Sequence, residues 1–338
     1  MKSIGVIYGG KSTERDVSKK SAHSILSNLN KEKYNIYPIF IDENGDWFDC
    51  KNKEKIKIEN EIKALKNLDI IFPVLHGLYG EDGTIQGLFE IAGVKYVGCN
   101  VLASSVGMDK AYTKIIFEKA NINQAKYLYV KKYENTNYIY IDEKFDEQEV
   151  NLDELIEIIE KKLKYPIFVK PSNSGSSVGV NKCKNKYELK ENIKIASKYD
   201  NKILIEQGII GKEVECAVLG NDKIGIEVTD PGEIIPSNEY YSFDSKYNDV
   251  NSKTLINSNI TREQKEEIKK LAKKAFLAID GNGLSRVDFF VEDATGKIYI
   301  NEINTMPGFT EISMYPKLFE AYGYKYDKLL DKIIEISL

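Results

Sequence analysis

Short apolar runs, glycine-rich turns and amphipathic stretches alternate through the first third of the chain, and this alternation restricts the fold more than any other feature. The apolar runs at 4–8 and 69–75 each lead to a glycine-rich turn, Gly9-Gly10 in the first case and 77–83 in the second. A helical pattern follows each turn. Because strand–turn–helix repetition builds parallel sheets, the sequence predicts an α/β unit whose ligands bind beyond the carboxyl ends of its strands.

The rest of the chain mixes helices with antiparallel strand pairs. Helices are predicted at 108–120, 152–163 and 261–279, and a hairpin is predicted at 285–304. We therefore expect an α/β fold that becomes α+β in the C-terminal part. A polar and aromatic segment at 237–258 has little periodicity. A loop of that length is usually functional or disordered.

Composition argues against several classes of protein. The 338 residues include 48 basic and 52 acidic side chains, and the net charge of -4 gives no reason to expect a nucleic-acid or membrane partner. No apolar run approaches the roughly 18 residues of a membrane span. The four cysteines are far apart and there are only two histidines, so a Cys/His zinc site is not expected. Because the N-terminus has no signal-peptide pattern, we expect a cytoplasmic protein.

The predicted hairpin carries the clearest candidate site. Glu302 and Asn304 lie two residues apart on one strand and so project from the same face, as Arg286 and Asp288 do on the preceding strand. Asp288, Glu302 and Asn304 could converge as an all-oxygen site for Mg²⁺ that bridges phosphates. Arg286 would then suit the stabilisation of developing negative charge. The alternative to a metal site is that these residues form an exposed polar face of the sheet, although opposed acids flanked by apolar residues are costly without a cation.

Other candidate residues are less specific when taken singly. A loop of small residues at 172–179 follows Lys170 and could hold a phosphate, but it lacks the P-loop spacing and could equally be an ordinary turn. Glu206 and Glu213 could bind a purine amino group and a ribose hydroxyl, or be surface carboxylates. His76 ends a strand that faces the expected ligand crevice, although a lone histidine is more often structural than catalytic.

These features coincide with the motifs of one enzyme family. The chain resembles the D-alanine–D-alanine ligases over nearly its whole length, and the order and spacing of the matching segments are far more specific than any one of them. The segments are GGKSTERDVS at 9–18, HG at 76–77, GEDGTIQG at 80–87, MDK at 108–110, VKP at 169–171, GSSVG at 175–179, RVD at 286–288 and NEINTMPGFT at 301–310.

The resemblance implies an ATP-grasp fold of three domains, with ATP held between the central and C-terminal ones. We expect an N-terminal α/β substrate-binding domain at 1–98 and a central ATP-grasp subdomain at 99–207. The C-terminal ATP-grasp subdomain, at 208–338, is expected to contain the metal site and a lid loop at 237–258. A homodimer is the family expectation.

The resemblance also implies roles for individual residues. Three lysines would contact the ATP phosphates, and the other members of the nucleotide set would hold adenosine. The nucleotide set is Lys110, Lys170, Lys246, Glu206, Gln207, Ile209 and Glu213. Asp288, Glu302 and Asn304 would bind two Mg²⁺ ions, for which Mn²⁺ can substitute.

Further residues would bind the amino acids and stabilise the reaction. Glu14 would receive the ammonium group of the first D-alanine, within a hydrogen-bonded set that includes Ser176 and Tyr247. Arg286 and the backbone N–H of Gly308 would form the oxyanion site. The side chains implied to contact substrate are His76, Ser313 and Met314.

The implied activity is ATP-dependent ligation of two D-alanines through an acyl phosphate, for peptidoglycan precursor synthesis. The alternative is a D-alanine–D-serine or D-alanine–D-lactate ligase of the resistance type. Tyr247 argues against D-lactate and Met314 against D-serine, while 254–257 lacks the Pro-Ala usually found there. A carboxylase-like or amide-forming ATP-grasp enzyme would not be expected to keep Glu14, His76-Gly77 and Met314 together. A nucleotide-binding regulator without enzymatic activity should have lost a metal ligand or Arg286.

Overall fold

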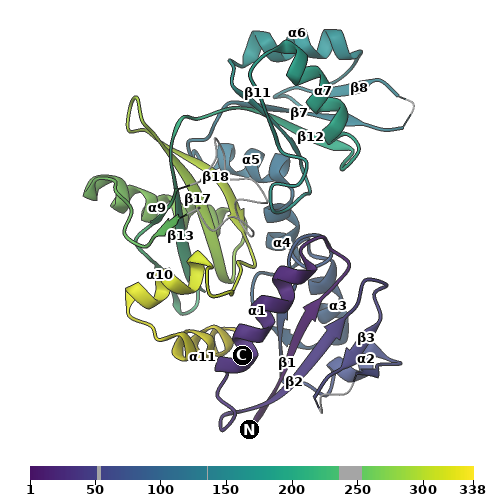
Figure 1. The fold of residues 1–338 in the computed structure, drawn as a ribbon, viewed down its shortest axis with the longest axis vertical. Helices are drawn as coiled ribbons and strands as arrows, with labels where there is room; N and C mark the ends of the chain where they lie inside the picture. Colours follow the sequence, from purple (N-terminus) through teal and green to yellow (C-terminus); the bar gives the residue numbers. More distant parts are fainter. Residues whose placement is uncertain (52–54, 135, 236–252) are drawn as a thin grey trace.

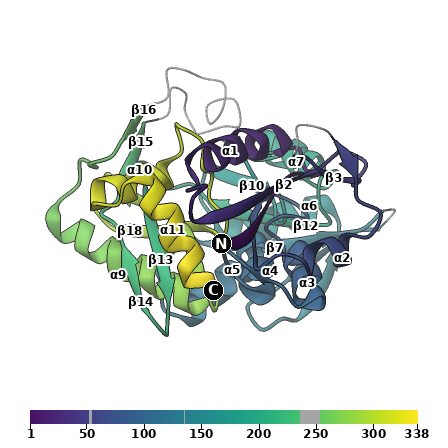
Figure 2. The ribbon, with the colours of Figure 1, turned by 90° about the horizontal axis from the view of Figure 1, so that it is seen from below.

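Three six-stranded sheets, one in each third of the chain, organise the molecule. The structure is a computed structural model that describes residues 1–51, 55–134, 136–235 and 253–338. In Figure 1 the N-terminal sheet lies at the bottom, the middle sheet at the top and the C-terminal sheet at the left. Figure 2 shows the same arrangement from below, with the N- and C-termini close together.

The N-terminal sheet has the strand order β4-β3-β2-β1-β5-β6. Its four strands β2, β1, β5 and β6 are parallel, which confirms the predicted parallel unit, while β3 and β4 add an antiparallel edge that the sequence did not predict. Because β1 and β5 are neighbours, the glycine-rich turns that follow them meet at one edge of the sheet. The elements are β1 (Lys2–Gly9), α1 (Arg15–Asn28), β2 (Tyr34–Ile41), β3 (Trp47–Asp49), β4 (Ile56–Lys57), α2 (Glu61–Leu65), β5 (Ile70–Val74), α3 (Thr84–Ala92) and β6 (Lys95–Tyr96).

The middle sheet is antiparallel throughout, in the order β11-β10-β12-β7-β8-β9. Alternate strand residues face two apolar clusters, one shared with α6 and α7 and the other with α5. Asp109 begins α5 by accepting hydrogen bonds from the N–H groups of Ala111 and Tyr112. The elements are α4 (Val101–Met108), α5 (Lys110–Lys119), β7 (Tyr127–Lys132), β8 (Tyr138–Ile141), β9 (Glu147–Val150), α6 (Leu152–Lys162), β10 (Ile167–Pro171), β11 (Asn181–Cys183), α7 (Lys186–Ala196) and β12 (Lys202–Gln207).

The C-terminal sheet has the order β16-β15-β13-β17-β18, and β14 also pairs with β13. Val287 and Phe289 pack with Phe276 of α9, so the other face carries Arg286 and Asp288, as the alternation predicts. The predicted hairpin is confirmed, with a register shift at Asp288/Phe289. The elements are β13 (Gly211–Asn221), β14 (Gly225–Val228), β15 (Gly232–Ile235), β16 (Lys253–Leu255), α9 (Arg262–Ala278), β17 (Gly283–Glu292), β18 (Ile298–Asn304), α10 (Met314–Tyr322) and α11 (Tyr326–Ser337).

One apolar cluster joins the two ends of the chain. It contains Ile4 and Phe72 from the N-terminal sheet together with Phe309, Tyr315 and Leu330 from the C-terminal segment. Each predicted domain range contains one sheet, but this shared core crosses between the first and the third, and the boundaries at 98 and 207 stay predictions.

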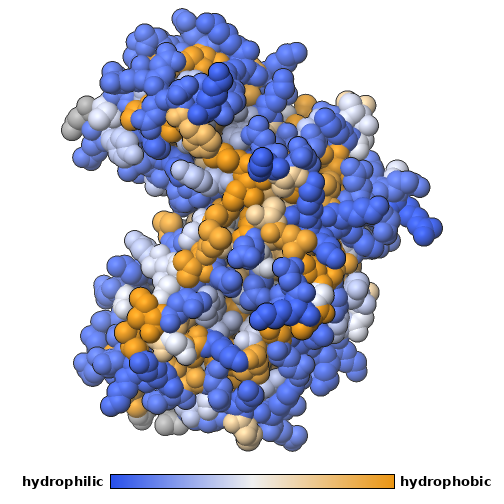
Figure 3. Space-filling model, turned by 180° about the vertical axis from the view of Figure 1, so that it is seen from behind, coloured by the Kyte–Doolittle hydropathy of each residue, from blue (hydrophilic) through white to orange (hydrophobic). Residues whose placement is uncertain are grey.

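The surface view agrees with this arrangement. Hydrophilic residues cover most of the outside, and hydrophobic ones gather where the lobes meet (Figure 3). Among the described helices, none is both long enough and apolar enough to cross a membrane.

The joint between the two ends can be tested at Phe72, whose ring lies edge-on to that of Phe309 at a centroid distance of 5.7 Å. Phe72→Ala would leave a cavity in a fully buried site, and we expect the free energy of unfolding to fall by about 3–5 kcal/mol. Chemical denaturation measures the change. The matched control is Ile91→Ala, because Ile91 is 77% exposed. An equal effect of both substitutions would contradict the buried joint.

Candidate active site

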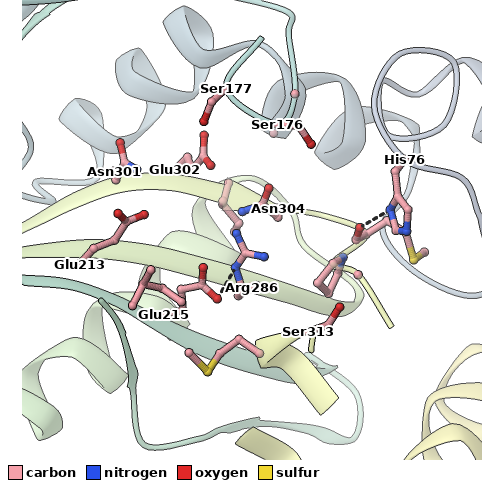
Figure 4. Close-up of a pocket in the computed structure, with 18 of the residues that line it drawn as sticks. His76, Ser176, Ser177, Glu213, Glu215, Arg286, Asn301, Glu302, Asn304 and Ser313 are labelled. Atoms are coloured by element: carbon pink, nitrogen blue, oxygen red, sulfur yellow. Dashed lines mark hydrogen bonds and ion pairs between the residues drawn. The ribbon is translucent and has the colours of Figure 1, made fainter. Parts of the chain in front are cut away.

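One cavity of about 740 Å³ lies where the three sheets approach one another. Residues from the start of α1, the end of β5, the start of α5, and strands β10, β17 and β18 line it. Figure 4 shows side chains from these separate elements turned toward one space. The carboxyl edge of the parallel sheet, where the sequence predicted ligands to bind, contributes Glu14 and His76.

Glu14 is held at one end of the cavity by contacts from two other parts of the chain. It is 7% exposed, and the hydroxyl of Ser176 donates a hydrogen bond to its Oε1. A Cβ on Gly77 or Gly175 would collide with Oε2 of this carboxylate, so a larger residue at either position would displace Glu14. Ser176 and Ser177 have left-handed φ values of 50° and 59°, which non-glycine residues rarely adopt. The loop thus reaches Glu14 through an unusual backbone turn, a feature that often marks functional sites.

His76 is buried beside Glu14 and links the two ends of the chain. Its Nδ1 lies 3.3 Å from Glu81 Oε1 and 3.2 Å from the carbonyl oxygen of Met306, and its Nε2 lies 3.2 Å from Ser21 Oγ. Burial opposes the charged imidazolium, but Glu81, Glu14 and the Met306 carbonyl outweigh it and raise the pKa of His76. Ser21 Oγ also accepts the N–H of Phe309, at 3.1 Å. This hydroxyl therefore fixes the segment that carries Gly308.

Arg286 is bound by two carboxylates on the charged face of the C-terminal sheet. Its Nε and Nη2 donate to the two oxygens of Asp288 at 2.7 and 2.6 Å, and Nε lies 3.1 Å from Glu215 Oε2. Burial disfavours the cation, but Asp288 and Glu215 more than compensate and raise the pKa of Arg286. Asp288 is only 1% exposed and does not line the cavity, because it lies under the guanidinium group. Figure 4 shows the contact between Arg286 and Glu215.

The three predicted metal ligands are neighbours but are not equally accessible. Asp288 lies opposite Glu302 across β17 and β18, and Asn304 Nδ2 donates to Asp288 Oδ2 at 3.1 Å. Glu302 and Asn304 line the cavity, and Glu302 Oε2 lies 3.7 Å from Lys110 Nζ. Carboxylate and amide oxygens of this kind fit a divalent cation such as Mg²⁺. Asp288 accepts from Arg286 through both of its oxygens.

The predicted phosphate lysines are held by acceptors of the protein itself. Lys110 Nζ donates to the carbonyl oxygen of Ser174 at 2.7 Å. Lys170 forms an ion pair with Glu206, whose other oxygen lies 3.0 Å from Lys114 Nζ. Burial would raise the pKa of Glu206, but the two lysines lower it to about 2. Glu206 and Gln207 line a smaller cavity of about 40 Å³, which shares Lys170 and Ile209 with the large one.

The structure therefore brings most of the predicted site together. Glu206 and Gln207 line the smaller cavity and Asp288 lies behind Arg286. Lys246, Tyr247 and most of the predicted lid fall outside the described residues. The predicted residues that line the large cavity are Glu14, His76, Lys110, Lys170, Ser176, Ile209, Glu213, Arg286, Glu302, Asn304, Gly308, Ser313 and Met314.

Sequence reasoning missed three charged residues at the site. Glu81 accompanies His76, Glu215 accompanies Arg286, and Lys114 accompanies Glu206. Lys114 follows Lys110 by four residues, so helical periodicity alone places both on one face of α5. The alternation that placed Arg286 on the charged face of β17 likewise applies to Glu213 and Glu215 on β13.

Comparison with known proteins settles the family. Models of the N-terminus and the C-terminus of D-ala D-ala ligases match residues 3–99 and 116–335. The chain belongs to the D-ala D-ala ligase family. It is 48% identical to the D-alanine–D-alanine ligase of Acetivibrio thermocellus, over 100% of this chain and 96% of that protein. It is 45% identical to the one from Clostridium acetobutylicum, over 99% and 98%.

Solved structures of the family have the same fold. The VanG D-Ala:D-Ser ligase from Enterococcus faecalis superposes with a TM-score of 0.85 at 34% identity, over 100% of this chain and 99% of that one. The D-alanine-D-alanine ligase from Coxiella burnetii gives a TM-score of 0.80 at 32% identity, over 99% and 93%. The predicted ATP-grasp fold and the assignment to the ligases are confirmed by these relatives.

The tight packing around Glu14 predicts the effect of adding one methyl group. Gly175→Ala would force Glu14 out of its place, and we expect ligase activity to fall on the order of 100-fold, as for other displacements of about an ångström. ATP-dependent phosphate release measures the activity. Gly87→Ala is the control, because a Cβ there meets nothing within 4 Å. Full activity of Gly175→Ala would show that this placement of Glu14 is not required.

The raised pKa of His76 predicts a pH-dependent stability. Since the folded-state pKa lies above the ordinary 6.5, the stabilisation is fully present below 6.5 and is lost as the pH rises through the folded-state value. His76→Gln removes this contribution. The difference in free energy of unfolding between wild type and variant should therefore be largest at acidic pH and shrink on raising the pH. Denaturation curves from about pH 5 to pH 9 would measure it, and a constant difference would contradict the assignment.

Proposed function

We propose that this chain joins two D-alanines to form D-alanyl-D-alanine, with conversion of ATP to ADP and phosphate, for peptidoglycan precursor synthesis. The observation that carries the proposal is the composition of the large cavity in a member of this ligase family. A buried carboxylate suited to an ammonium group, two lysines suited to phosphates, an arginine and a glycine with its backbone N–H all line it; they are Glu14, Lys110, Lys170, Arg286 and Gly308.

The first step needs an activated carboxylate, because a free carboxylate is a poor electrophile. Glu14, oriented by Ser176, receives the ammonium group of the first D-alanine and directs its carboxylate toward the γ-phosphate of ATP. Lys110 and Lys170 neutralise the phosphate oxygens. Lys246, which is outside the described residues, is proposed to act with them. Attack of the carboxylate oxygen on the γ-phosphorus forms an acyl phosphate and releases ADP.

The metal site is proposed at Glu302, Asn304 and Asp288, with two Mg²⁺ ions and with Mn²⁺ as a substitute. All three side chains supply oxygen ligands, and two of them already line the cavity. When bound, the metal ions neutralise charge on the phosphoryl oxygens during transfer. Adenosine is proposed to lie against Glu206, Gln207, Ile209 and Glu213, which line the small cavity or the adjoining part of the large one.

The second step forms the peptide bond. The deprotonated amine of the second amino acid attacks the acyl carbon, and Arg286 and the N–H of Gly308 stabilise the oxyanion. One such donor is worth roughly 3–4 kcal/mol in comparable sites. The carboxylate of this substrate faces the N-terminus of α10, which begins after Ser313 and favours an anion. Collapse of the tetrahedral intermediate expels phosphate.

Met314 supports D-alanine as the second substrate. Its side chain lines the cavity, is 3% exposed and packs against Gly232, where a Cβ would lie 2.7 Å from the sulfur. A thioether is a poor partner for a hydroxyl group, so this wall gives D-serine little gain over D-alanine. The structural neighbour from Enterococcus faecalis is a D-Ala:D-Ser ligase with the same fold. The fold therefore does not distinguish the two second substrates, and the side chains of the pocket must do so.

The cellular setting is also a proposal. The four cysteines, Cys50, Cys99, Cys183 and Cys216, are free, which fits a reducing compartment such as the cytoplasm. A homodimer follows from the resemblance to the family. Tyr247, which bears on D-lactate as an alternative substrate, lies outside the described residues.

Phosphate release with ATP, Mg²⁺ and D-alanine tests the proposed activity. We expect release that depends on D-alanine, with D-alanyl-D-alanine identified by mass. Reactions that also contain D-serine or D-lactate should still give mainly this dipeptide. A dominant mixed product would assign the chain to the resistance-type ligases, and folded, ATP-binding protein without D-alanine-dependent release would refute the ligase proposal.

A further inference from the structure

A buried lysine that the proposed reaction leaves without a role lies next to the small cavity. Lys114, on α5, has a side chain that is only 3% exposed, and its Nζ lies 3.0 Å from Glu206 Oε2. Neither atom has a well-aligned hydrogen bond within the described part of the chain, so charge holds the pair together. The Tyr127 ring, 5.4 Å from Nζ, covers the lysine. An unpaired buried charge is very costly, so each ion needs the other.

Glu206 binds a different lysine through each of its two oxygens. Lys114 is beside Oε2, and Lys170 is bound to Oε1. The two lysines differ in accessibility: the side chain of Lys170 is 13% exposed and lines both cavities, whereas Lys114 lines only the small one. Lys170 can therefore turn toward phosphates in the large cavity, whereas within the described part of the chain the ion pair of Lys114 is the one with Glu206.

If Lys170 left Glu206 for the phosphates, one carboxylate oxygen would be freed and one of the two cations would be removed. If Lys114 were absent as well, the buried carboxylate of Glu206 would have no cation beside it and would take up a proton. A protonated carboxyl group donates as well as accepts hydrogen bonds, so it could pair with an oxo group or an amino group of a purine. An ionised carboxylate only accepts, and so it pairs with the amino group alone.

We propose that Lys114 is a positioning residue for the nucleotide base. It holds Glu206 Oε2 and keeps this carboxylate ionised once Lys170 has turned to the phosphates. Oε1 then selects a 6-amino purine. The inference rests on the proposed use of ATP. It assigns the choice of base to this ion pair. The tyrosine, the lysines and Glu302, which also attracts Lys114, are the charged and titratable groups around the pair.

Equilibrium binding of ATP and of inosine triphosphate, measured by calorimetry with Mg²⁺, tests this inference. Inosine triphosphate differs in having a 6-oxo group where ATP has a 6-amino group. We expect wild type to prefer ATP by about 10-fold or more, and Lys114→Met to lose most of that preference. Lys114→Arg should restore part of it. The matched control is Lys119→Met, an exposed position on the same helix, which should keep the wild-type ratio.

A merely structural role would lower the melting temperature of Lys114→Met without changing the ratio of the two affinities. An unchanged ratio in the folded variant, or no preference for ATP in wild type, would overturn the proposal. If Lys114→Met fails to fold, Glu206→Gln and the double variant Lys114→Met/Glu206→Gln replace it. The double variant removes both buried charges, so it leaves neither ion without its partner. The two should have the same ratio, and a further change in the double variant would overturn the proposal.

This binding assay is independent of peptide-bond formation. Wild-type protein that binds ATP selectively but makes no dipeptide would refute the proposed ligase activity and leave the role of Lys114 standing. Dipeptide formation by wild type together with an unchanged affinity ratio in Lys114→Met would support the ligase activity and overturn the role of Lys114.

Discussion

Carboxylates crowd one face of the C-terminal sheet, and the cations that compensate them come partly from within the sheet and partly from the middle unit. Glu215, Asp288 and Glu302 lie side by side on three adjacent strands. Arg286 neutralises two of them from within the sheet, while Lys110 approaches Glu302 from α5. Buried like charges repel unless cations separate them, so the approach of the middle unit to this sheet is favoured by charge as well as by apolar contact.

The opposite face of the same sheet explains why the charges point one way. Alternate residues of β13 and β17, including Val214 and Phe289, pack against α9 and form an apolar cluster. A strand turns every second side chain to the other side, so Glu213, Glu215 and Arg286 face the side on which the cavity lies. Burial of one face thus aligns the functional groups of the other without any separate device, and the β-hairpin holds Asp288 directly opposite Glu302.

Local patterns predicted those parts of the structure that local geometry determines. The alternation in β17 and β18, the glycine-rich turns after β1 and β5, and the helix α9 depend on a few consecutive residues, and the sequence shows them directly. The short strands β3 and β4 were missed because two or three residues carry too little periodicity. Likewise, the contact of Arg286 with Asp288 and that of Lys114 with Glu206 depend on how deeply each group is buried. The order of the motifs therefore predicted which residues line the cavity, but it could not predict the ion pairs that they form with one another.

The small-residue loop after β10 serves two binding pockets at once. Its Ser176 contacts Glu14 from the N-terminal unit, and its Ser174 carbonyl holds Lys110. A single short segment therefore contacts both Glu14 and Lys110, the residues proposed for the amino acid and for the phosphates. Movement of this loop would disturb both contacts together. The stretch 174–176 is therefore a single mechanical link between the two ends of the cavity, because it is bound to the N-terminal unit on one side and to α5 on the other.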